Sequence, residues 1–316
     1  MSTLAASFGL RLSERATGVA LAFATACVSG VAVYVNAKGV ARFDDATVYT
    51  TAKDAVAGLA LLALAAPLLA TRPRTVGRAA WPGTGRQRLG VVTIAVIGGS
   101  VPFVLFFEGL ARASATQAAF IHKTLVLWVA VLAVVLLRER LGRLHVLAIG
   151  LLMAGQVLLV PSLGVVTFGA GEAMILGATL LWAVEVILVK RLVTGLDPRT
   201  LAAARMGLGT LLLIAWVAVT GRGSELLGLD AGEWGWAVLT GALLAAYVAT
   251  WYAALARAQA VDVTAVLVFG AVVTAALSGA FDGVALDGAG LAVVTLGAGV
   301  AAAAALRRSG PRAVRT

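Results

Sequence analysis

Ionisable side chains interrupt several of the long apolar runs that make up most of this chain. The runs contain Lys53, Asp54, Lys123, Glu185 and Arg205. A charged side chain at the centre of a membrane helix costs about 2.5–3.5 kcal/mol on insertion scales, so it is kept mainly where a cavity or a partner compensates it. These residues therefore offer two kinds of chemistry, the reversible binding of a polar solute and the transfer of a proton.

Lys123 is the residue best placed to bind a solute. The fourth apolar run begins about nine residues before it, which puts Lys123 about 14 Å deep, close to the middle of a bilayer. Its ammonium cannot easily reach the surface from there. We expect it to bind an anionic group or to take part in proton transfer, with His122 or Thr124 beside it. The alternative is a structural pair with Glu185 or Asp54.

His122 and Glu185 are the candidates for proton coupling, and both are expected to bind substrate. An imidazole changes its charge near physiological pH. His122 points about 100° away from Lys123 on a helix, so we do not expect both to face a cavity equally, and a hydrogen bond between helices is the alternative for His122. Glu185 shares a helix face with Trp182, another expected binding residue. Its alternative role is that of counter-ion for Lys123 or Arg205.

Lys53 and Arg205 each lie about six residues into an apolar run, where binding or gating competes with structural pairing. Asp54 is the nearest partner of Lys53 in sequence. Because adjacent residues do not face each other on a helix, we expect these two to reach different helices. Three further residues are expected to line the cavity: Gln117, Tyr34 and Asn36.

Four residues near the ends of the third and eighth runs are candidate gates. Glu108 and Arg112 are four positions apart, a spacing that favours a surface ion pair as the alternative. Trp251 and Tyr252, near the end of the eighth run, match Phe106 and Phe107 at an offset of 145 residues. His145, at the end of the fifth run, is expected to be a simple interfacial residue.

Membrane-spanning helices must position these side chains. Hydrophobic residues make up 61% of the chain and charged residues only 13%, far outside the range of soluble domains. A helix needs about 20 apolar residues to cross the hydrocarbon core. Runs of this kind predict an all-α integral membrane protein with ten spans, at 16–37, 47–70, 90–110, 114–137, 144–161, 171–190, 200–220, 233–254, 260–280 and 289–306.

The net charge of +10 reflects basic residues that gather on one side of the membrane, and it does not indicate nucleic-acid binding. One interruption alone contains Arg72, Arg74, Arg78, Arg86 and Arg88. Cytoplasmic loops carry an excess of Lys and Arg, so we expect both termini in the cytoplasm and a multi-pass protein of the cytoplasmic membrane. Cys27 is the only cysteine, which excludes an intrachain disulfide and a cysteine metal cluster.

The chain contains an internal duplication, most evident where the sequence LARA at 110–113 recurs at 255–258. An offset of 145 relates these copies, and an offset of 152 sets Lys53 against Arg205. We predict two repeats, 1–163 and 164–316, with five spans each. Because five is odd, the second repeat is inverted in the membrane. Only Val268 matches Lys123 at the offset of 145, so we expect an asymmetric cavity.

The segment 111–160 reads ARASATQAAFIHKTLVLWVAVLAVVLLRERLGRLHVLAIGLLMAGQVLLV. Small residues lie at the start of the fourth span, and a turn follows at Arg138, Glu139 and Arg140. Gly150 and Gly155 lie along the fifth span. This segment resembles the EamA-type repeat of the drug/metabolite transporter superfamily. The resemblance covers nearly the whole chain as two copies, and it implies export of an amino acid or a related metabolite. We expect Glu139 to have a structural role.

These features favour a secondary transporter, acting as an exporter, that moves a small polar metabolite by alternating access. The balanced charges within the spans suit an amino acid, or an organic anion accompanied by a proton. No HExxH, Gly-x-Ser-x-Gly or phosphate-binding glycine loop occurs, which argues against an intramembrane enzyme and an ATP-driven pump. A non-transporting receptor or scaffold is the other alternative. We expect no cofactor and no metal, with the bilayer and the solute as partners, while proton coupling and a homodimer are left open.

Overall fold

The computed structural model describes residues 2–71, 78–110, 112–113, 115–159 and 168–307. Within these ranges the chain is helical apart from turns and one isolated bridge between Ala79 and Leu196. The helices are α1 (Ser2–Val40), α2 (Ala46–Thr71), α3 (Gly85–Gly99), α4 (Val101–Leu110), α5 (Ala115–Lys123), α6 (Leu125–Leu137), α7 (Arg143–Leu158), α8 (Ala170–Leu192), α9 (Pro198–Val219), α10 (Gly223–Leu227), α11 (Ala231–Leu255), α12 (Ala260–Leu267), α13 (Gly270–Asp282) and α14 (Gly288–Arg307).

Nine described stretches are long and apolar enough to cross a membrane, and they match nine of the ten expected spans. The expected span at 144–161 corresponds to α7, which has 16 residues and is about 24 Å long at 1.5 Å per residue. Residues 160–167, which include the expected boundary between the repeats, lie outside the described part. The all-α membrane class is therefore confirmed, whereas the count of ten spans is not.

Three of the spans consist of two helices in line. The third span breaks between α3 and α4 at Gly99 and Ser100, the fourth breaks at Thr124, and the ninth breaks at Val268 and Phe269. Thr124 and Phe269 correspond at the repeat offset of 145. Discontinuous helices at matching positions of two repeats are typical of the binding region in secondary transporters.

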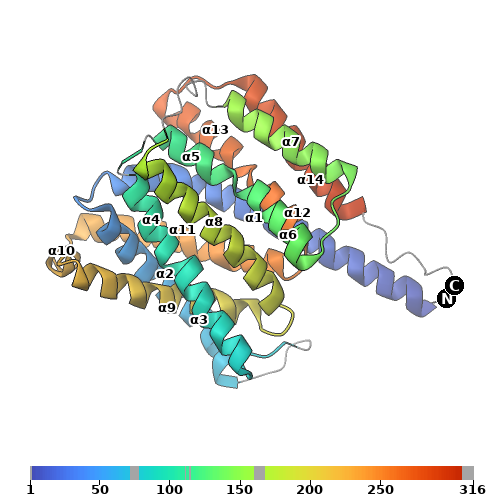
Figure 1. The fold of residues 1–316 in the computed structure, drawn as a ribbon, viewed down its shortest axis with the longest axis horizontal. Coiled ribbons are helices and arrows are strands. Elements are labelled where there is room, and N and C mark those ends of the chain that lie inside the picture. Colours follow the sequence, from blue (N-terminus) through green and yellow to red (C-terminus); the bar gives the residue numbers. More distant parts are fainter. Residues whose placement is uncertain (1, 72–77, 111, 114, 160–167, 308–316) are drawn as a thin grey trace.

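The packing of the helices follows a two-fold relation between the halves. In the first half α1 packs against α11, α12 and α13, and in the second half the corresponding α8 packs against α3, α4 and α6. Helices α2 and α9 pack against each other, as do α7 and α14, which Figure 1 shows side by side at one edge of the bundle. This is the pattern that a duplicated five-span unit produces.

Glycines permit the closest approaches between the halves, and these also occur in matching pairs. A Cβ on Gly18 would lie 3.0 Å from side-chain atoms of Arg257 and Ala258, and a Cβ on Gly171 would lie 2.9–3.0 Å from the backbone of Arg112 and Ala113. Both copies of the LARA sequence therefore pack on a glycine of the opposite half. Small residues allow such contacts where no hydrophobic force drives helices together in lipid.

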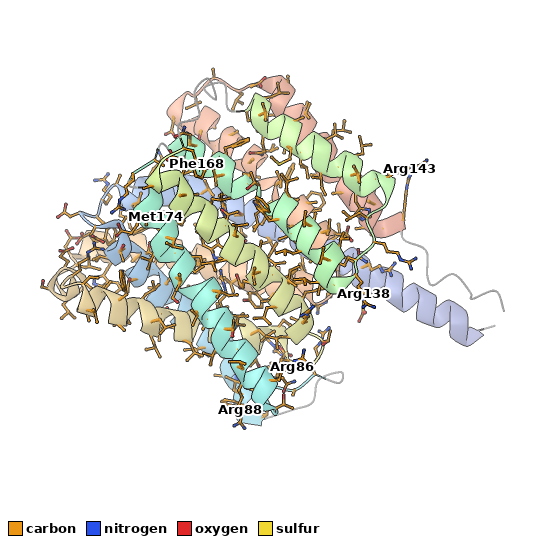
Figure 2. All side chains as sticks on the ribbon, viewed as in Figure 1. Arg86, Arg88, Arg138, Arg143, Phe168 and Met174 are labelled. Carbon is orange, nitrogen blue, oxygen red and sulfur yellow. The ribbon has the colours of Figure 1, made fainter. Side chains whose placement is uncertain are left out.

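Arginines mark one end of the bundle. Figure 2 shows Arg86, Arg88, Arg138 and Arg143 on the side away from Phe168 and Met174. The first turns of α1 and the last turns of α14 lie toward the side of Arg138 and Arg143 (Figure 1). We call this side the arginine-rich end.

Candidate functional site

Glu185, Arg205 and Tyr252 form a buried polar cluster where α8, α9 and α11 meet. The Tyr252 hydroxyl donates a hydrogen bond to Glu185 Oε1 at 2.6 Å, and Arg205 Nε lies 2.8 Å from the same oxygen. That Nε–H does not point at a hydrogen-bond acceptor, so the contact is a close charge pair. The alternative role of Glu185 as counter-ion of Arg205 is confirmed, and Tyr252, an expected gate, lies inside this cluster.

Lys53 is enclosed by aromatic rings on one side and a carboxylate on the other. Its Nζ lies 3.0 Å from Asp54 Oδ1, and it lies 4.8 Å and 5.4 Å from the ring centroids of Phe103 and Phe107. A cation over aromatic faces is stabilised by the ring quadrupoles. The expectation that Lys53 and Asp54 reach different helices is wrong, because the long lysine side chain folds back to its neighbour while the rings close off other directions.

The break in the third span gives Glu185 its position. Trp182 Nε1 donates to the carbonyl oxygen of Gly98 at 3.1 Å, and a Cβ on Gly98 would lie 2.4 Å from Glu185 Cδ. The end of α3 therefore approaches α8 so closely that only a glycine fits there. The same contact holds Trp182, an expected binding residue, against the broken helix.

A cavity of about 40 Å³ lies between the two halves, next to the breaks in the fourth and ninth spans. The side chains of His122, Lys123 and Val126 line it from the first half, and those of Tyr247, Thr264 and Val268 line it from the second half. Both His122 and Lys123, the last two residues of α5, line this cavity.

His122 and Lys123 bring unsatisfied polar groups to the cavity. His122 Nδ1 is buried and has no hydrogen-bond partner. Lys123 is half-buried, and among the described residues it forms neither an ion pair nor a hydrogen bond. The structural pair considered for Lys123 is therefore not formed, because Glu185 and Asp54 each bind a different cation.

Aromatic rings lead from this cavity toward the buried charge pairs. The ring of His122 lies 5.0 Å from that of Trp182 and 5.5 Å from that of Phe106, and Trp182 in turn lies 5.5 Å from Phe103. Such edge-to-face contacts fix the orientation of the rings. The guanidinium of Arg205 lies 5.7 Å from the ring of Phe103, so these rings connect His122 with the cluster of Glu185 and Arg205.

The remaining expected cavity residues lie elsewhere. Thr124 donates its hydroxyl to the carbonyl of Ile121 at 2.6 Å, which holds the break in the fourth span. Tyr34 donates to Asp282 Oδ1 at 3.2 Å. Asn36 accepts a hydrogen bond from Tyr49 at 2.6 Å, which joins α1 to α2. The structure does not place Tyr34, Asn36 or Gln117 among the residues that line the cavity.

An ion-pair network lies at the end of the bundle opposite the arginine-rich end. Glu108 Oε2 lies 2.7 Å from Arg112, which confirms the expected surface pair. Arg222 adds contacts of 3.2 Å to Glu108 and 3.4 Å to Asp45, so it joins the second half to two segments of the first.

Trp251, the other candidate gate, is buried and stacks on Tyr247 at 6.0 Å.

Two side chains hold the turn between α11 and α12 at the arginine-rich end. Lys190 Nζ donates to the carbonyl oxygens of Leu255, at 2.7 Å, and Ala258. Glu139 accepts hydrogen bonds from the backbone amides of Ala260, at 3.0 Å, and Val261, at 3.3 Å. These contacts agree with a structural role for Glu139. No role for Lys190 was predicted from the sequence. The signal that could have indicated one is that a lysine recurs at the matching position of both repeats, since Lys38 and Lys190 are 152 residues apart.

His145 and Asp262 also make a contact that the sequence did not predict. His145 Nε2 lies 2.9 Å from Asp262 Oδ1, and both side chains are buried. The expectation that His145 is a simple interfacial residue is therefore wrong, because α12 covers it. The signal for Asp262 was a carboxylate inside the ninth apolar run.

Among the described residues, no group of three or more His, Cys, Asp or Glu side chains is placed to hold a metal ion.

Comparison with known proteins agrees with this geometry. A family model described as the EamA-like transporter family matches residues 16–160 and again 169–304. A solved structure titled "Crystal structure of protein" shares the fold, with a TM-score of 0.74 and 18% identity over 91% of this chain and 98% of that one. No curated protein matches the chain. The two family matches cover most of the sequence, and the chain belongs to the EamA-like transporter family of multi-pass membrane proteins.

Proposed function

We propose that this transporter moves a small polar metabolite with an anionic group, an amino acid or an organic anion, through the cavity of His122 and Lys123. The observation that carries the proposal is the ammonium of Lys123, which lies between the halves without an ion-pair partner among the described residues. An uncompensated cation away from water is costly. A carboxylate of the solute would supply the missing partner.

The other cations within the spans support this choice of solute. Lys53 is compensated by Asp54, and Arg205 is compensated by Glu185. Both pairs are electrically neutral, so they neither attract nor repel an incoming ion strongly. A cationic drug would meet only the positive charge of Lys123 in the cavity, and this argues against it as the substrate.

Alternating access is supported by the size of the cavity and by the broken helices. A cavity of about 40 Å³ has room for no more than a few water molecules, since each needs at least about 10–15 Å³ of such space. An amino acid therefore enters only if α5 and α6 move away from α12. The breaks at Thr124 and Phe269 give the two halves equivalent joints for that movement.

The two ends of the bundle differ in a way that fits one of two alternating states. At the arginine-rich end, Lys190 and Glu139 hold the turn at 255–261. Lys38, which matches Lys190 at the offset of 152, instead pairs at 2.7 Å with Asp282, two residues before the position that matches Glu139 at the offset of 145. In the opposite state we expect Lys38 to hold the carbonyl oxygens at 110–113, as Lys190 holds those at 255–258.

The orientation in the membrane follows from the arginines. Because Lys and Arg concentrate in cytoplasmic loops, the arginine-rich end faces the cytoplasm and both termini lie there, in a protein of the cytoplasmic membrane. The transporter then acts as an exporter that takes its solute from the cytoplasm. Glu185 and His122 are the groups near the cavity that can carry a proton against the solute.

A thermal-shift screen of the purified protein tests this proposal. Amino acids, organic acids, nucleosides and amines are compared on the wild type, on Lys123→Ala and on the control Arg88→Ala, which changes an exposed cation of α3. A ligand at 100 times its Kd stabilises by about 2.7 kcal/mol. We expect an anionic or zwitterionic hit that Lys123→Ala loses and Arg88→Ala keeps. A hit restricted to amines would contradict the proposal.

A further inference from the structure

A buried acid–base pair joins α7 to α12, in a different place from the cavity of His122 and Lys123. His145 Nε2 lies 2.9 Å from Asp262 Oδ1, and the two side chains are 5% and 4% exposed. We propose that this pair is a proton-binding site served from the arginine-rich end, with the carboxylate of Asp262 as the acceptor. The inference rests on the proposed function, because it names the ion that drives the transport.

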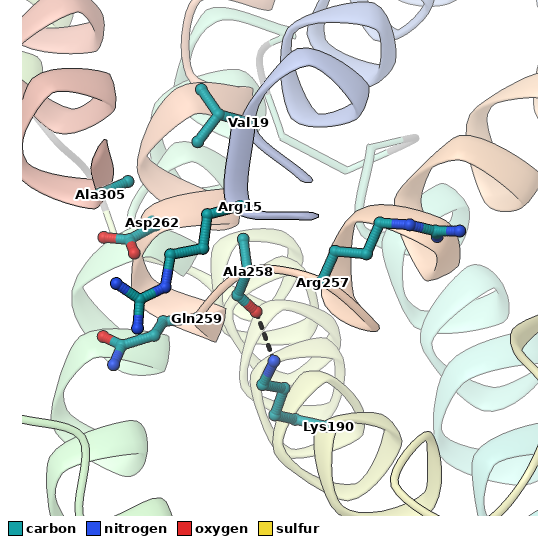
Figure 3. A pocket seen from close by; sticks show the side chains of 8 residues that line it. All are labelled: Arg15, Val19, Lys190, Arg257, Ala258, Gln259, Asp262 and Ala305. Carbon is teal, nitrogen blue, oxygen red and sulfur yellow. Dashed lines mark hydrogen bonds between the residues drawn. The ribbon is translucent and has the colours of Figure 1, made fainter. Parts of the chain in front are cut away.

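Asp262 has a route to water through a second cavity of about 200 Å³. Figure 3 shows Arg15, Gln259 and Asp262 around one space, with Lys190 below them bound to the carbonyl of Ala258. Water can carry a proton through a polar cavity of this size. The pair is therefore buried in protein and yet reached from one end of the bundle.

The charged groups that face Asp262 come from several elements. Arg15 from α1 and Lys190 from α8 line the cavity together with Asp262, and α14 contributes the apolar Ala305. Arg257, in the turn before α12, points away from Asp262 and donates to the carbonyl oxygen of Ala253 at 2.9 Å (Figure 3). Glu139 binds the first amides of α12, two residues before Asp262. Adding a proton to Asp262 changes the balance of charge around the turn that Lys190 and Glu139 hold.

The hydrogen-bond network indicates where the added proton goes. His145 Nδ1 accepts the backbone N–H of Gly142 at 3.3 Å, so the neutral imidazole carries its own hydrogen on Nε2 and donates it to Asp262 Oδ1. The basic atom that is free to accept is then the other carboxylate oxygen. A proton from water in the cavity converts the Asp262 carboxylate into a neutral carboxylic acid, without breaking the contact with Gly142.

Protonation at this position has a direct consequence for the turn. Asp262 lies in the first turn of α12, where a negative charge stabilises the helix. Its loss also removes an attraction for Lys190, whose Nζ holds Leu255 and Ala258. Proton binding therefore loosens the turn at 255–261, which links the ion to the opening of the arginine-rich end.

The duplication argues against a purely structural role. At the offset of 145, Asp262 corresponds to Gln117 and His145 corresponds to Gly290. The corresponding positions of α5 and α14 therefore hold an amide and a glycine where α12 and α7 hold an acid and a base. A buried ion pair often contributes little to stability compared with apolar packing, so the fold alone gives no reason for an ion pair at only one of these two symmetry-related places.

The test uses the full chain in liposomes with Asp262→Asn, and with Glu225→Gln as the control at an exposed carboxylate of α10. A labelled mixture of neutral amino acids and dicarboxylates is followed in two assays, exchange at equal pH and accumulation driven by a pH gradient, with a pH dye in the lumen. We expect Asp262→Asn to retain exchange and to lose gradient-driven accumulation and lumenal pH change. The control variant is expected to retain all three.

The outcomes separate this inference from the proposed function. If Asp262→Asn still accumulates solute with the gradient, the proton site is wrong while the transporter stands. If the wild type exchanges none of these solutes, the proposed function fails, and infrared difference spectra on acidification still test the site. A band of the protonated carboxyl group that is as strong in Asp262→Asn as in the wild type overturns it. Asp262→Glu, which keeps an acid, is expected to restore coupling if the asparagine variant unfolds.

Discussion

Arg205 Nε lies 2.8 Å from Glu185 Oε1, and the same carboxylate oxygen accepts a hydrogen bond from the Tyr252 hydroxyl at 2.6 Å. The pair is buried between α8 and α9. Because Glu185 pairs with Arg205, it does not neutralise the charge of Lys123. The cation in the cavity is left for the solute.

Removing one member of this pair is expected to destabilise the protein strongly. Glu185→Ala leaves Arg205 buried without a counter-ion, which costs about 3–5 kcal/mol. The double change Glu185→Gln with Arg205→Met should recover part of that loss, since neither charge then remains. Denaturant unfolding in detergent measures the free energies. Equal stability of Glu185→Ala and the wild type would mean that the two charges are not coupled.

Gly98 provides a test of how tightly α3 approaches this pair. A Cβ at this position would lie 2.4 Å from Glu185 Cδ, so Gly98→Ala must displace the carboxylate from Tyr252 and Arg205. Gly150→Ala is the matched control, because no heavy atom lies within 4 Å of its added Cβ. We expect a loss of about 1–3 kcal/mol for Gly98→Ala and a slight gain for Gly150→Ala, since alanine favours a helix. Similar melting temperatures for the two variants would refute the close approach.

Glu139 is expected to control access to the arginine-rich end. Glu139→Gln weakens the bonds to the amides of Ala260 and Val261, and the loss of a helix cap costs about 0.5–2 kcal/mol. A thiol introduced by Gln259→Cys, in a Cys27→Ser background, reports the opening of the turn. We expect its labelling by a maleimide to accelerate by a factor of about 5–30. The control Glu225→Gln, at an exposed position of α10, should leave the labelling rate unchanged. If Glu139→Gln also left the labelling rate unchanged, Glu139 would not hold the turn between α11 and α12 in place.

The proposed orientation predicts which thiols an impermeant reagent can reach in intact cells. Leu227→Cys in α10 is exposed at the end opposite the arginines and should react from outside, whereas Arg88→Cys should react only after the membrane is permeabilised. Both variants carry Cys27→Ser so that the new thiol is the sole one. The reverse pattern of labelling would invert the topology and with it the direction of export.

Much of the architecture could be predicted because membrane helices are specified locally. Long apolar runs define nine spans that the structure contains, and the second copy of LARA predicted the duplication that Gly18 and Gly171 show in their contacts. The tenth span was harder to predict, because α7 is short. Its apolar composition alone does not show whether it crosses.

The partners of individual side chains could not be predicted in the same way. Adjacent positions on a helix diverge by about 100°, and this argument failed for Lys53 because its long side chain bends back to Asp54 between aromatic rings from α4. His145 was misplaced for a related reason, since only the tertiary fold brings Asp262 over it. Rotation and tilt of each helix, set by packing with its neighbours, decide such contacts.

Exchange of a labelled solute in liposomes, compared between the wild type, Lys123→Ala and Lys123→Arg, tests the central claim most directly. The solute is an anionic or zwitterionic compound that stabilises the wild type in the thermal-shift screen. If Lys123 binds its anionic group, Lys123→Ala abolishes exchange and Lys123→Arg, which keeps the charge, retains part of it. Exchange by folded Lys123→Ala at the rate of the wild type, with an unchanged concentration dependence, would contradict the account.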